Sequence, residues 1–223
     1  MTWVKICGMT NLEDALTAVE AGADAVGFVF YEKSPRNISV DAAREIVEKL
    51  PGNVEKVGVF VNESTERVSA TADEVGLTAV QFHGDEYQSP EMYATDRKTF
   101  LCIPADWVAM AWRKKGKASG SLMAIPENLG AIMLDSGDDG RRGGTGNPFD
   151  WREAAVFVSL MSKDTPVVIA GGLTSENVRE AMQILKPWGV DVASGVEARP
   201  GKKDPEKVRS FIRAVREIDK KKS

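Results

Sequence analysis

The segment Pro166-Val167-Val168-Ile169-Ala170-Gly171-Gly172-Leu173-Thr174 holds a continuous apolar run that ends in two adjacent glycines. A run of this kind, unbroken by polar residues, is typical of a parallel strand that is covered on both faces. The next such run, near residues 189–193, leads into Ser194 and Gly195. In parallel α/β barrels the loops after the seventh and eighth strands commonly form a phosphate site, so this pair of segments favours a barrel.

Strand-like and helix-like runs alternate from one end of the chain to the other. Continuous apolar runs predict strands near residues 2–6, 24–30, 54–61, 77–82, 99–103, 130–135, 166–170 and 189–193. Amphipathic runs predict helices near residues 11–21, 40–50, 64–75, 88–97, 106–115, 151–162, 175–186 and 205–218. With no composition break between them, these units predict an α/β protein whose residues 1–223 form a single (β/α)8 TIM barrel. A doubly wound open sheet is the alternative, because periodicity alone does not separate a closed sheet from an open one.

Two of the predicted helices begin with capping signals. Thr10 precedes Glu13 at the spacing of a capping box. Asp204 precedes Pro205 and Glu206, which is an N-cap residue followed by a proline at the first helical position and an early acidic residue. We therefore expect Thr10 and Asp204 to cap the helices that follow them.

Composition and charge exclude several classes of function. Of 223 residues, 43% are hydrophobic and 28% charged, and the formal net charge is -4. No large basic block suggests nucleic acid as a partner, and no apolar run approaches the ~18 residues of a membrane span. The N-terminus lacks a signal peptide, and Cys7 and Cys102 make no disulfide framework, so we expect a cytoplasmic location. The only histidine, His83, and the lack of a CxxC pair argue against a metal site of the Cys/His kind.

Two candidate catalytic side chains stand at the ends of predicted strands. Cys7 follows the first strand, and Asp135 follows the apolar run 132–134 of the sixth. The strand ends of a parallel barrel form its catalytic face. A thiolate there can act as a base, and a carboxyl group next to apolar residues can keep a proton to donate. The alternatives are a buried strand cysteine and an aspartate that only caps a helix or forms a turn.

Other positions on the same face suit ligand binding. Arg36, in the loop after the second strand, can form a bidentate pair with a carboxylate, and His83, at the end of the fourth, can hydrogen-bond a ligand. Glycines let a backbone approach a phosphate, and a serine adds a hydroxyl. The alternatives are a solvated arginine, a histidine that caps a strand, and glycines that only form tight turns. The predicted phosphate loops contain Gly171, Gly172, Ser194 and Gly195.

In combination these segments resemble the phosphoribosylanthranilate isomerase family of tryptophan biosynthesis, in the order of that family and over nearly the whole chain. The matching segments are KICG at 5–8, GFVF at 27–30, SPR at 34–36, VGVFVN at 57–62, QFHG at 81–84, LD at 134–135, GGTG at 143–146, FDW at 149–151, GGL at 171–173, ENV at 176–178, VDVASGVE at 190–197 and PGKKD at 200–204. Ala193 departs from the pattern, because many relatives have a serine there.

The resemblance implies an isomerase that performs an Amadori rearrangement, without a metal or an organic cofactor. The substrate would be the phosphosugar N-(5-phosphoribosyl)anthranilate and the product 1-(2-carboxyphenylamino)-1-deoxyribulose 5-phosphate. The resemblance further implies that Cys7 is the general base, that Asp135 is the general acid and that Arg36 binds the anthranilate carboxylate. Family members occur as monomers and as homodimers, and both states stay open. The phosphate would be bound by Gly171, Gly172, Ser194 and Gly195.

Two other functions stay open at this point. A sugar isomerase of histidine biosynthesis performs the same chemistry on a related fold, but that group uses an aspartate at the position of Cys7. A barrel that binds a phosphorylated metabolite without turnover is the non-enzymatic alternative, and the presence of both Cys7 and Asp135 argues against it. Residues 104–129 look longer than the corresponding segment of the family, and their sequence predicts no role.

Overall fold

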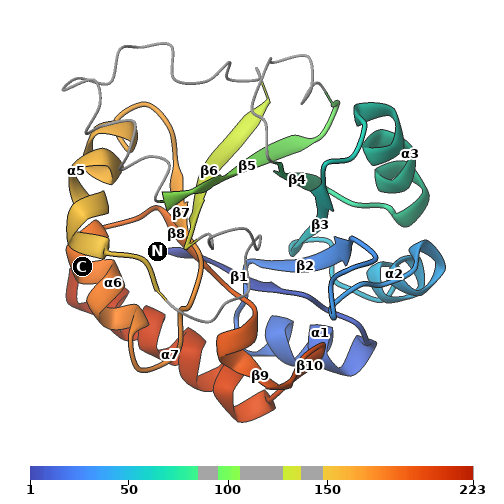
Figure 1. Ribbon diagram of the computed structural model, residues 1–223. Coiled ribbons are helices and arrows are strands. Elements are labelled where there is room, and N and C mark those ends of the chain that lie inside the picture. The colour runs from blue at the N-terminus through green and yellow to red at the C-terminus, as the bar shows by residue number, and fades with distance from the viewer. Residues whose placement is uncertain (85–94, 106–127, 137–147, 223) are drawn as a thin grey trace.

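The chain forms a closed barrel of eight parallel strands, each paired with the next along the chain (Figure 1). The computed structural model describes residues 1–84, 95–105, 128–136 and 148–222. The strands are β1 (Trp3–Cys7), β2 (Ala25–Phe30), β3 (Glu55–Val61), β4 (Ala79–His83), β5 (Lys98–Pro104), β6 (Leu129–Asp135), β7 (Val167–Ile169) and β8 (Gly189–Val192). Because β8 pairs with β1, the sheet has no edge. The predicted TIM barrel is confirmed, and the open doubly wound sheet is wrong.

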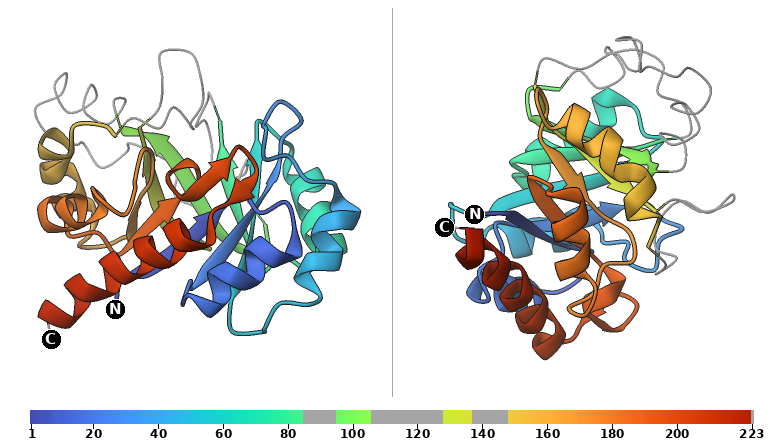
Figure 2. Two further views of the ribbon diagram at one scale, coloured as in Figure 1. Left: turned by 90° about the horizontal axis from the view of Figure 1, so that it is seen from below. Right: turned by 90° about the vertical axis from the view of Figure 1, so that its left-hand side faces the viewer.

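Helices cover the outside of the barrel, as the views in Figure 2 show. Those in the described ranges are α1 (Leu12–Glu20), α2 (Val40–Val47), α3 (Thr65–Val75), α5 (Trp151–Met161), α6 (Val178–Leu185) and α7 (Pro205–Lys222). The last helix, α7, packs against both α1 and α6 and so closes the helical layer where the two ends of the sheet meet. Between β8 and α7 lie a short 3-10 helix, η2 (Ser194–Val196), and a hairpin of β9 (Glu197–Arg199) and β10 (Lys202–Lys203).

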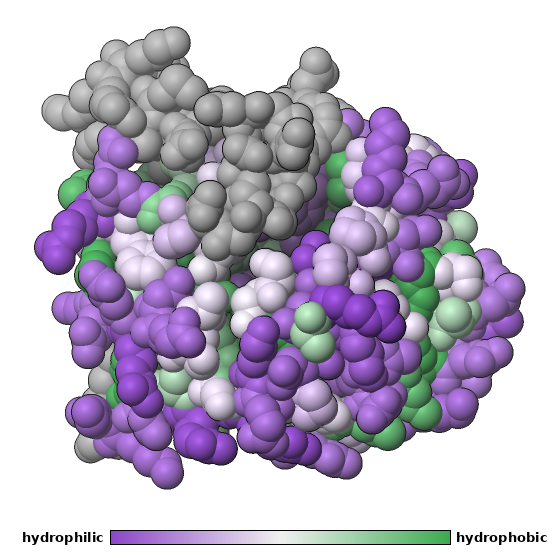
Figure 3. Space-filling view, turned by 60° about the horizontal axis from the view of Figure 1, so that its bottom comes forward, coloured by the Kyte–Doolittle hydropathy of each residue, from purple (hydrophilic) through white to green (hydrophobic). Residues whose placement is uncertain are grey.

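Alternation along the strands divides the core into two layers. Val4 and Ile6 of β1 belong to the large apolar cluster that joins the strands to the helices, and Phe211 of α7 belongs to it too. The alternate residues of β1 point into the barrel, where strands β2 to β7 supply a second cluster of Ala25, Val57, Ala79, Phe100, Cys102, Ala131, Met133, Val168 and Ala170. Hydrophilic side chains dominate the outer face shown in Figure 3. The barrel is therefore a filled core, and ligands can reach it only at its ends.

The two capping predictions have different outcomes. Asp204 caps α7 as predicted, because its side chain accepts from the backbone N–H groups of Glu206 and Lys207 at 2.9 and 3.1 Å. The capping box at Thr10 is wrong. Asn11 caps α1 by accepting from the backbone N–H of Asp14 at 3.0 Å, and the Thr10 hydroxyl instead donates to the carbonyl of Gly201. That carbonyl belongs to the hairpin after β8, which the sequence pattern did not reveal.

The predicted strands agree closely with the observed ones, and the helices agree less well. The predicted helix 106–115 and most of 88–97 lie outside the described residues, while residues 95–97 lead into β5 without helical structure. The last helix runs on to Lys222, beyond its predicted end at 218. Within the described ranges, no helix combines the length and the apolar composition needed to span a bilayer.

Candidate active site at the carboxyl ends of the strands

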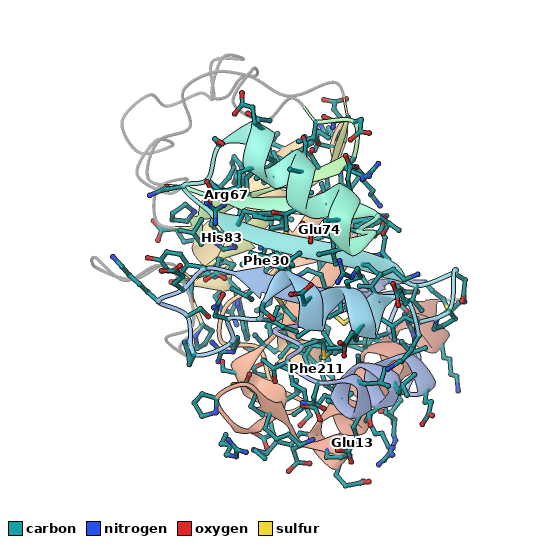
Figure 4. The ribbon with its side chains drawn as sticks, turned by 90° about the vertical axis from the view of Figure 1, so that its right-hand side faces the viewer. Glu13, Phe30, Arg67, Glu74, His83 and Phe211 are labelled. Carbon is teal, nitrogen blue, oxygen red and sulfur yellow. The ribbon has the colours of Figure 1, made fainter. Side chains whose placement is uncertain are left out.

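The strands of the barrel all end on one rim, where the helices begin. Figure 4 shows His83, at the end of β4, on the same side as Arg67 in the first turn of α3. Glu74, near the other end of that helix, lies on the opposite side. Since every strand is parallel, the ends of β1 and β6 and the loops after β2, β7 and β8 share this rim. The predicted site residues stand there: Cys7, Arg36, His83, Asp135, Gly171, Gly172, Ser194 and Gly195.

Cys7 is the last residue of β1, and its thiol lies against β2. Its side chain is nearly buried, with 7% exposure. A Cβ atom on the neighbouring Gly27 would stand only 2.7 Å from the Cys7 sulfur, so the glycine of the GFVF segment makes room for the thiol. Val29 and Val59 form a small apolar cluster with Cys7. The prediction that a cysteine ends the first strand at the rim is thus confirmed, and its catalytic role stays a prediction.

Charged side chains from several elements act on this thiol. Burial raises the pKa of Cys7, and the carboxylate of Asp191 on β8 raises it further. Lys5 on β1 and Lys203 on β10 lower the pKa of Cys7, because an ammonium favours the thiolate, but burial prevails and the pKa of Cys7 stays above its ordinary value. Both positive and negative charges therefore act on the thiol. The sequence did not reveal that Lys203 lies near it, and indicated for Lys5 only that it shares the strand face of Cys7.

Arg36 folds back over the end of β1. Gly8 follows Cys7 with a positive φ of 82°, and a Cβ on it would lie 2.5 Å from the Cδ of Arg36, so this position requires glycine. The guanidinium donates from Nε and Nη2 to the two carboxylate oxygens of Glu197, both at 2.8 Å. The side chain of Arg36 is 13% exposed. Its placement at the rim agrees with the prediction, while its pairing with a carboxylate of this chain was not expected.

Glu197 connects the hairpin to the rim of the barrel. Glu197 also accepts a hydrogen bond from the Nζ of Lys203 at 3.0 Å. The side chains of Glu197 and Lys203 are almost fully buried. The same ammonium donates to the carbonyl of Ala193 at 3.1 Å. Burial alone raises the pKa of Glu197, but Arg36 and Lys203 more than offset this and hold it below its ordinary value. This charged triad ties the loop after β2 to the segment after β8.

Asp135 ends β6 on the inner face of the barrel and is half-buried. The hydroxyl of Ser136 donates to its carboxylate at 3.3 Å. Burial raises the pKa of the Cys102 thiol on β5 well above its ordinary value, and the nearby charge of Asp135 raises it further. Cys102 is 2% exposed. The prediction of a buried core thiol at Cys102 is therefore confirmed, and it lines the interior between β4 and β6.

The two predicted glycine loops lie in direct contact. A Cβ on Gly195 would stand 1.8 Å from the carbonyl oxygen of Leu173, so the loop after β8 presses on the loop after β7. A Cβ on Gly171 would stand 2.4 Å from the backbone nitrogen of Ser136, at the end of β6. These close approaches leave no space for side chains. Ser194 opens η2 beside them. The geometry brings the loops together as predicted, and phosphate binding stays a prediction.

His83 ends β4 with its ring held by a neighbour on the same strand face. Its Nε2 lies 2.6 Å from the amide nitrogen of Gln81. The amide donates in this pair, which requires the ring nitrogen to accept and therefore to carry no proton. The ring is half-buried, and a role toward a ligand is not tested by this geometry.

Several charged residues of the site were missed in the sequence. These are Lys5, Asp191, Glu197 and Lys203. In the described ranges, no three His, Cys, Asp or Glu side chains come together as metal ligands, and a reaction without metal or cofactor stays a prediction. The GGTG segment at 143–146 and most of 104–129 lie outside the described residues.

Comparison with protein families and with known proteins gives one consistent result. The family model described as N-(5'phosphoribosyl)anthranilate (PRA) isomerase matches residues 4–214. The N-(5'-phosphoribosyl)anthranilate isomerase of Citrifermentans bemidjiense is 47% identical over 219 residues, which cover 98% of this chain and 98% of that protein. The similarity therefore extends over the whole barrel and includes the rim.

Two solved structures resemble this one closely. The first contains monomers generated from the dimeric phosphoribosylanthranilate isomerase of Thermotoga maritima. The second is a phosphoribosylanthranilate isomerase in complex with reduced 1-(o-carboxyphenylamino)-1-deoxyribulose 5-phosphate. Each has a TM-score of 0.77 and 39% sequence identity, and each match covers 97% of this chain and 100% of the other.

The Glu197 triad leads to a prediction about pH and stability. Because the folded state lowers the pKa of Glu197, the stabilisation is present above the unfolded-state pKa and is lost as the pH falls through the folded-state value. Glu197→Gln should lower the free energy of unfolding by about 3 kcal/mol at neutral pH, since it leaves Arg36 and Lys203 without their counter-charge. This loss should shrink in acid, as urea unfolding at a series of pH values would measure.

Glu206→Gln is the matched control, because the carboxylate of Glu206 is 77% exposed in its pair with Arg209. Its stability should follow the wild type at every pH. A Glu197→Gln variant whose deficit stays constant from neutral to acid pH would contradict the account of the triad.

Proposed function

The chain belongs to the N-(5'-phosphoribosyl)anthranilate isomerase family, and we propose that it catalyses the rearrangement of N-(5-phosphoribosyl)anthranilate to 1-(2-carboxyphenylamino)-1-deoxyribulose 5-phosphate, a step of tryptophan biosynthesis. The observation that carries the proposal is the shared rim. Cys7 and Asp135 end two strands of one closed barrel, with a cationic side chain and two glycine loops beside them.

Asp135 is the proposed general acid. Ring opening of the aminoaldose needs a proton on the furanose oxygen, and the leaving oxygen then becomes a hydroxyl. The carboxyl group of Asp135 stands on the inner face at the end of β6, where the Ser136 hydroxyl holds it by a hydrogen bond. Ring opening produces a Schiff base between C1 of the sugar and the anthranilate nitrogen.

Cys7 is the proposed general base. The Schiff base loses the proton at C2 of the sugar to the thiolate, and the resulting enolamine tautomerises to the aminoketose. β1 and β6 are separated by β7 and β8 around the barrel, so the base and the acid approach the sugar from different sides. Groups that face one bound sugar from two sides can act in sequence without moving the substrate.

Two anchors would hold the substrate at its ends. A guanidinium has five N–H donors, and Glu197 receives only those on Nε and Nη2 of Arg36, so further donors can bind the anthranilate carboxylate. The loops with Gly171, Gly172, Ser194 and Gly195 would receive the phosphate through backbone N–H groups. Arg36 comes from the loop after β2 and the glycine loops follow β7 and β8, so the two anchors come from different strand ends, although the guanidinium reaches Glu197 just after Gly195. His83, at the end of β4, is a further proposed contact of the substrate.

The remaining features of the proposal concern partners and location. The partner is a small phosphosugar, and nucleic acid and membranes are not expected. The chain is a monomer or a homodimer, and sedimentation would distinguish the two. We also propose a cytoplasmic location, which two buried cysteines outside any disulfide favour because cytosolic thiols are kept reduced.

The test is conversion of substrate made in place from anthranilate and phosphoribosyl pyrophosphate by anthranilate phosphoribosyltransferase. We expect the fluorescence of the substrate to disappear with the wild-type chain. Cys7→Ser and Asp135→Asn should each lower kcat by about 10²–10⁴-fold with a modest change in KM, since each removes a proton-transfer group and keeps the shape. Cys102→Ser is the matched control, because it replaces the other buried thiol, and it should keep most of the kcat.

The same assay separates the alternative functions. Activity only on the isomerisation substrate of histidine biosynthesis, or binding of a product analogue without turnover by the wild type, would overturn the proposal. Turnover close to wild type in Cys7→Ser or in Asp135→Asn would remove that residue from its proposed role.

The two-anchor arrangement predicts selective loss of affinity. Arg36→Met should weaken binding of the whole product by about 2–5 kcal/mol, because the carboxylate loses a charged partner. Ribulose 5-phosphate lacks that carboxylate, so its affinity should stay nearly unchanged in a calorimetric titration. Arg199→Met is the control and should affect neither ligand, because Arg199 is an exposed arginine of the β9–β10 hairpin that Arg36 contacts. Equal losses for both ligands in Arg36→Met would contradict the assignment of Arg36 to the carboxylate.

A further inference from the structure

A buried ion pair lies inside the barrel directly beneath Cys7. Lys5 precedes Cys7 by two positions on β1, so both side chains point into the barrel. Lys5 is fully buried, and its Nζ lies 2.8 Å from the Oδ1 of Asp191 on β8. The two residues are direct partners in the register of β1 and β8. The positive charge of Lys5 lowers the pKa of the Cys7 thiol, which lies two positions further along the same face of β1.

Stability alone does not account for this pair. Most of the buried residues on the inner face are apolar, with Val57, Phe100, Met133 and Val168 among them. Replacing a buried ion pair by apolar side chains of similar volume is often neutral or stabilising, because two charges must otherwise be taken out of water. A lysine and an aspartate in this layer therefore point to a role in the chemistry at the rim.

The other charged groups near Cys7 have different main partners. Lys203 on β10 donates to Glu197 and to the carbonyl of Ala193. The guanidinium of Arg36 is directed at Glu197. Among the charges that favour the thiolate of Cys7, Lys5 has the largest effect. The groups that act on Cys7 or respond to its charge are, element by element, Lys5 on β1, Asp191 on β8, Lys203 on β10, Cys102 on β5 and Arg36 after β2.

We propose that Lys5 is a positioning residue that favours the thiolate form of Cys7 against the cost of burial, and that Asp191 keeps Lys5 charged and in place. The proposal rests on the proposed function, because it assigns Cys7 the role of the base. Burial disfavours a thiolate, and a positive charge close to the sulfur offsets that cost. Asp191 has two opposite effects, since it supports the ammonium of Lys5 and repels the negative sulfur.

These opposite effects define the role of Lys5 as a fixed charge. Burial lowers the pKa of Lys5, but Asp191 and the thiol more than offset this and raise it above its ordinary value. Because its own pKa is raised, Lys5 keeps its proton at neutral pH and supplies a positive charge near Cys7. Lys5 exchanges no proton with the substrate. Its removal should therefore shift a limb of the pH profile of the reaction, and no limb should disappear.

The experiment titrates the only thiol left in a Cys102→Ser background. The ultraviolet absorbance of the thiolate is followed against pH without substrate, and the pH profile of kcat/KM is then measured with substrate. Lys5→Met should lower the thiolate fraction at neutral pH by about tenfold and move the lower limb of the kcat/KM profile to higher pH. Asp191→Asn should move both titrations the same way by a smaller amount, because Lys5 loses the carboxylate that keeps it charged while the sulfur loses a repelling charge.

Further variants separate electrostatics from structure. The double variant Lys5→Met/Asp191→Asn should titrate between the wild type and Lys5→Met, and Lys5→Arg should stay close to the wild type. Lys56→Met is the matched control: Lys56 is another buried lysine on a strand, but its Nζ donates to the carbonyl of Pro51, so Cys7 should titrate normally. If Lys5→Met does not fold, the double variant decides, because it leaves no unpaired charge.

An unchanged Cys7 titration in Lys5→Met or in the double variant would overturn the proposal. A shift of Asp191→Asn toward more thiolate would overturn the role of Asp191 in keeping Lys5 charged. The thiol titration needs no substrate, so a chain that shows the expected order of titrations but converts no substrate would contradict the proposed function and leave the electrostatic inference supported.

Discussion

The pairing of β1 with β8 is the contact on which the rest of this molecule depends. It closes the sheet and brings together residues far apart in the sequence, since Lys5 and Asp191 are 186 positions apart. The same closure sets the end of β1 beside the segment after β8, so that Arg36 can reach Glu197 over Gly8. An open sheet would separate these groups and remove both the buried ion pair and the charged triad.

Small residues at the rim are the second constraint, because several groups approach the backbone more closely than a side chain would permit. The Cys7 sulfur occupies the space left by Gly27, and Arg36 occupies the space over Gly8. The carbonyl of Leu173 occupies the space beside Gly195. Glycines in the KICG, GFVF and SGVE segments are thus explained by packing inside this chain. A bound ligand would restrict the side chains at these positions further.

Much of the fold and part of the site could be predicted from the sequence. Continuous apolar runs locate parallel strands well, because strands covered on both faces leave little room for polar residues. Cys7 and Asp135 could be recognised because a polar residue at the end of such a run lies on the catalytic rim. Ser194 and Gly195 could be recognised because a hydroxyl and a glycine after a strand suit a phosphate. The partners of these residues were harder to find.

The missed features share a physical cause, which is that they depend on contacts between distant segments. Lys5 looks like an interruption of an apolar strand until Asp191 is placed beside it. The hairpin of β9 and β10 is short and charged, so no periodicity marks it. That hairpin also explains why the predicted cap at Thr10 is wrong. The Thr10 hydroxyl donates to the carbonyl of Gly201, and Asn11 caps α1 instead.

The central claim is that one sugar lies between Cys7 and Asp135, held at its two ends by Arg36 and by the glycine loops. A crystal structure of this chain with the reduced product analogue tests it most directly. We expect the anthranilate carboxylate on Arg36, the phosphate on the backbone of the loops after β7 and β8, and C2 of the sugar within about 4 Å of the Cys7 sulfur, as a near-attack geometry requires. A phosphate bound away from those loops, or a C2 atom that faces neither Cys7 nor Asp135, would contradict the account.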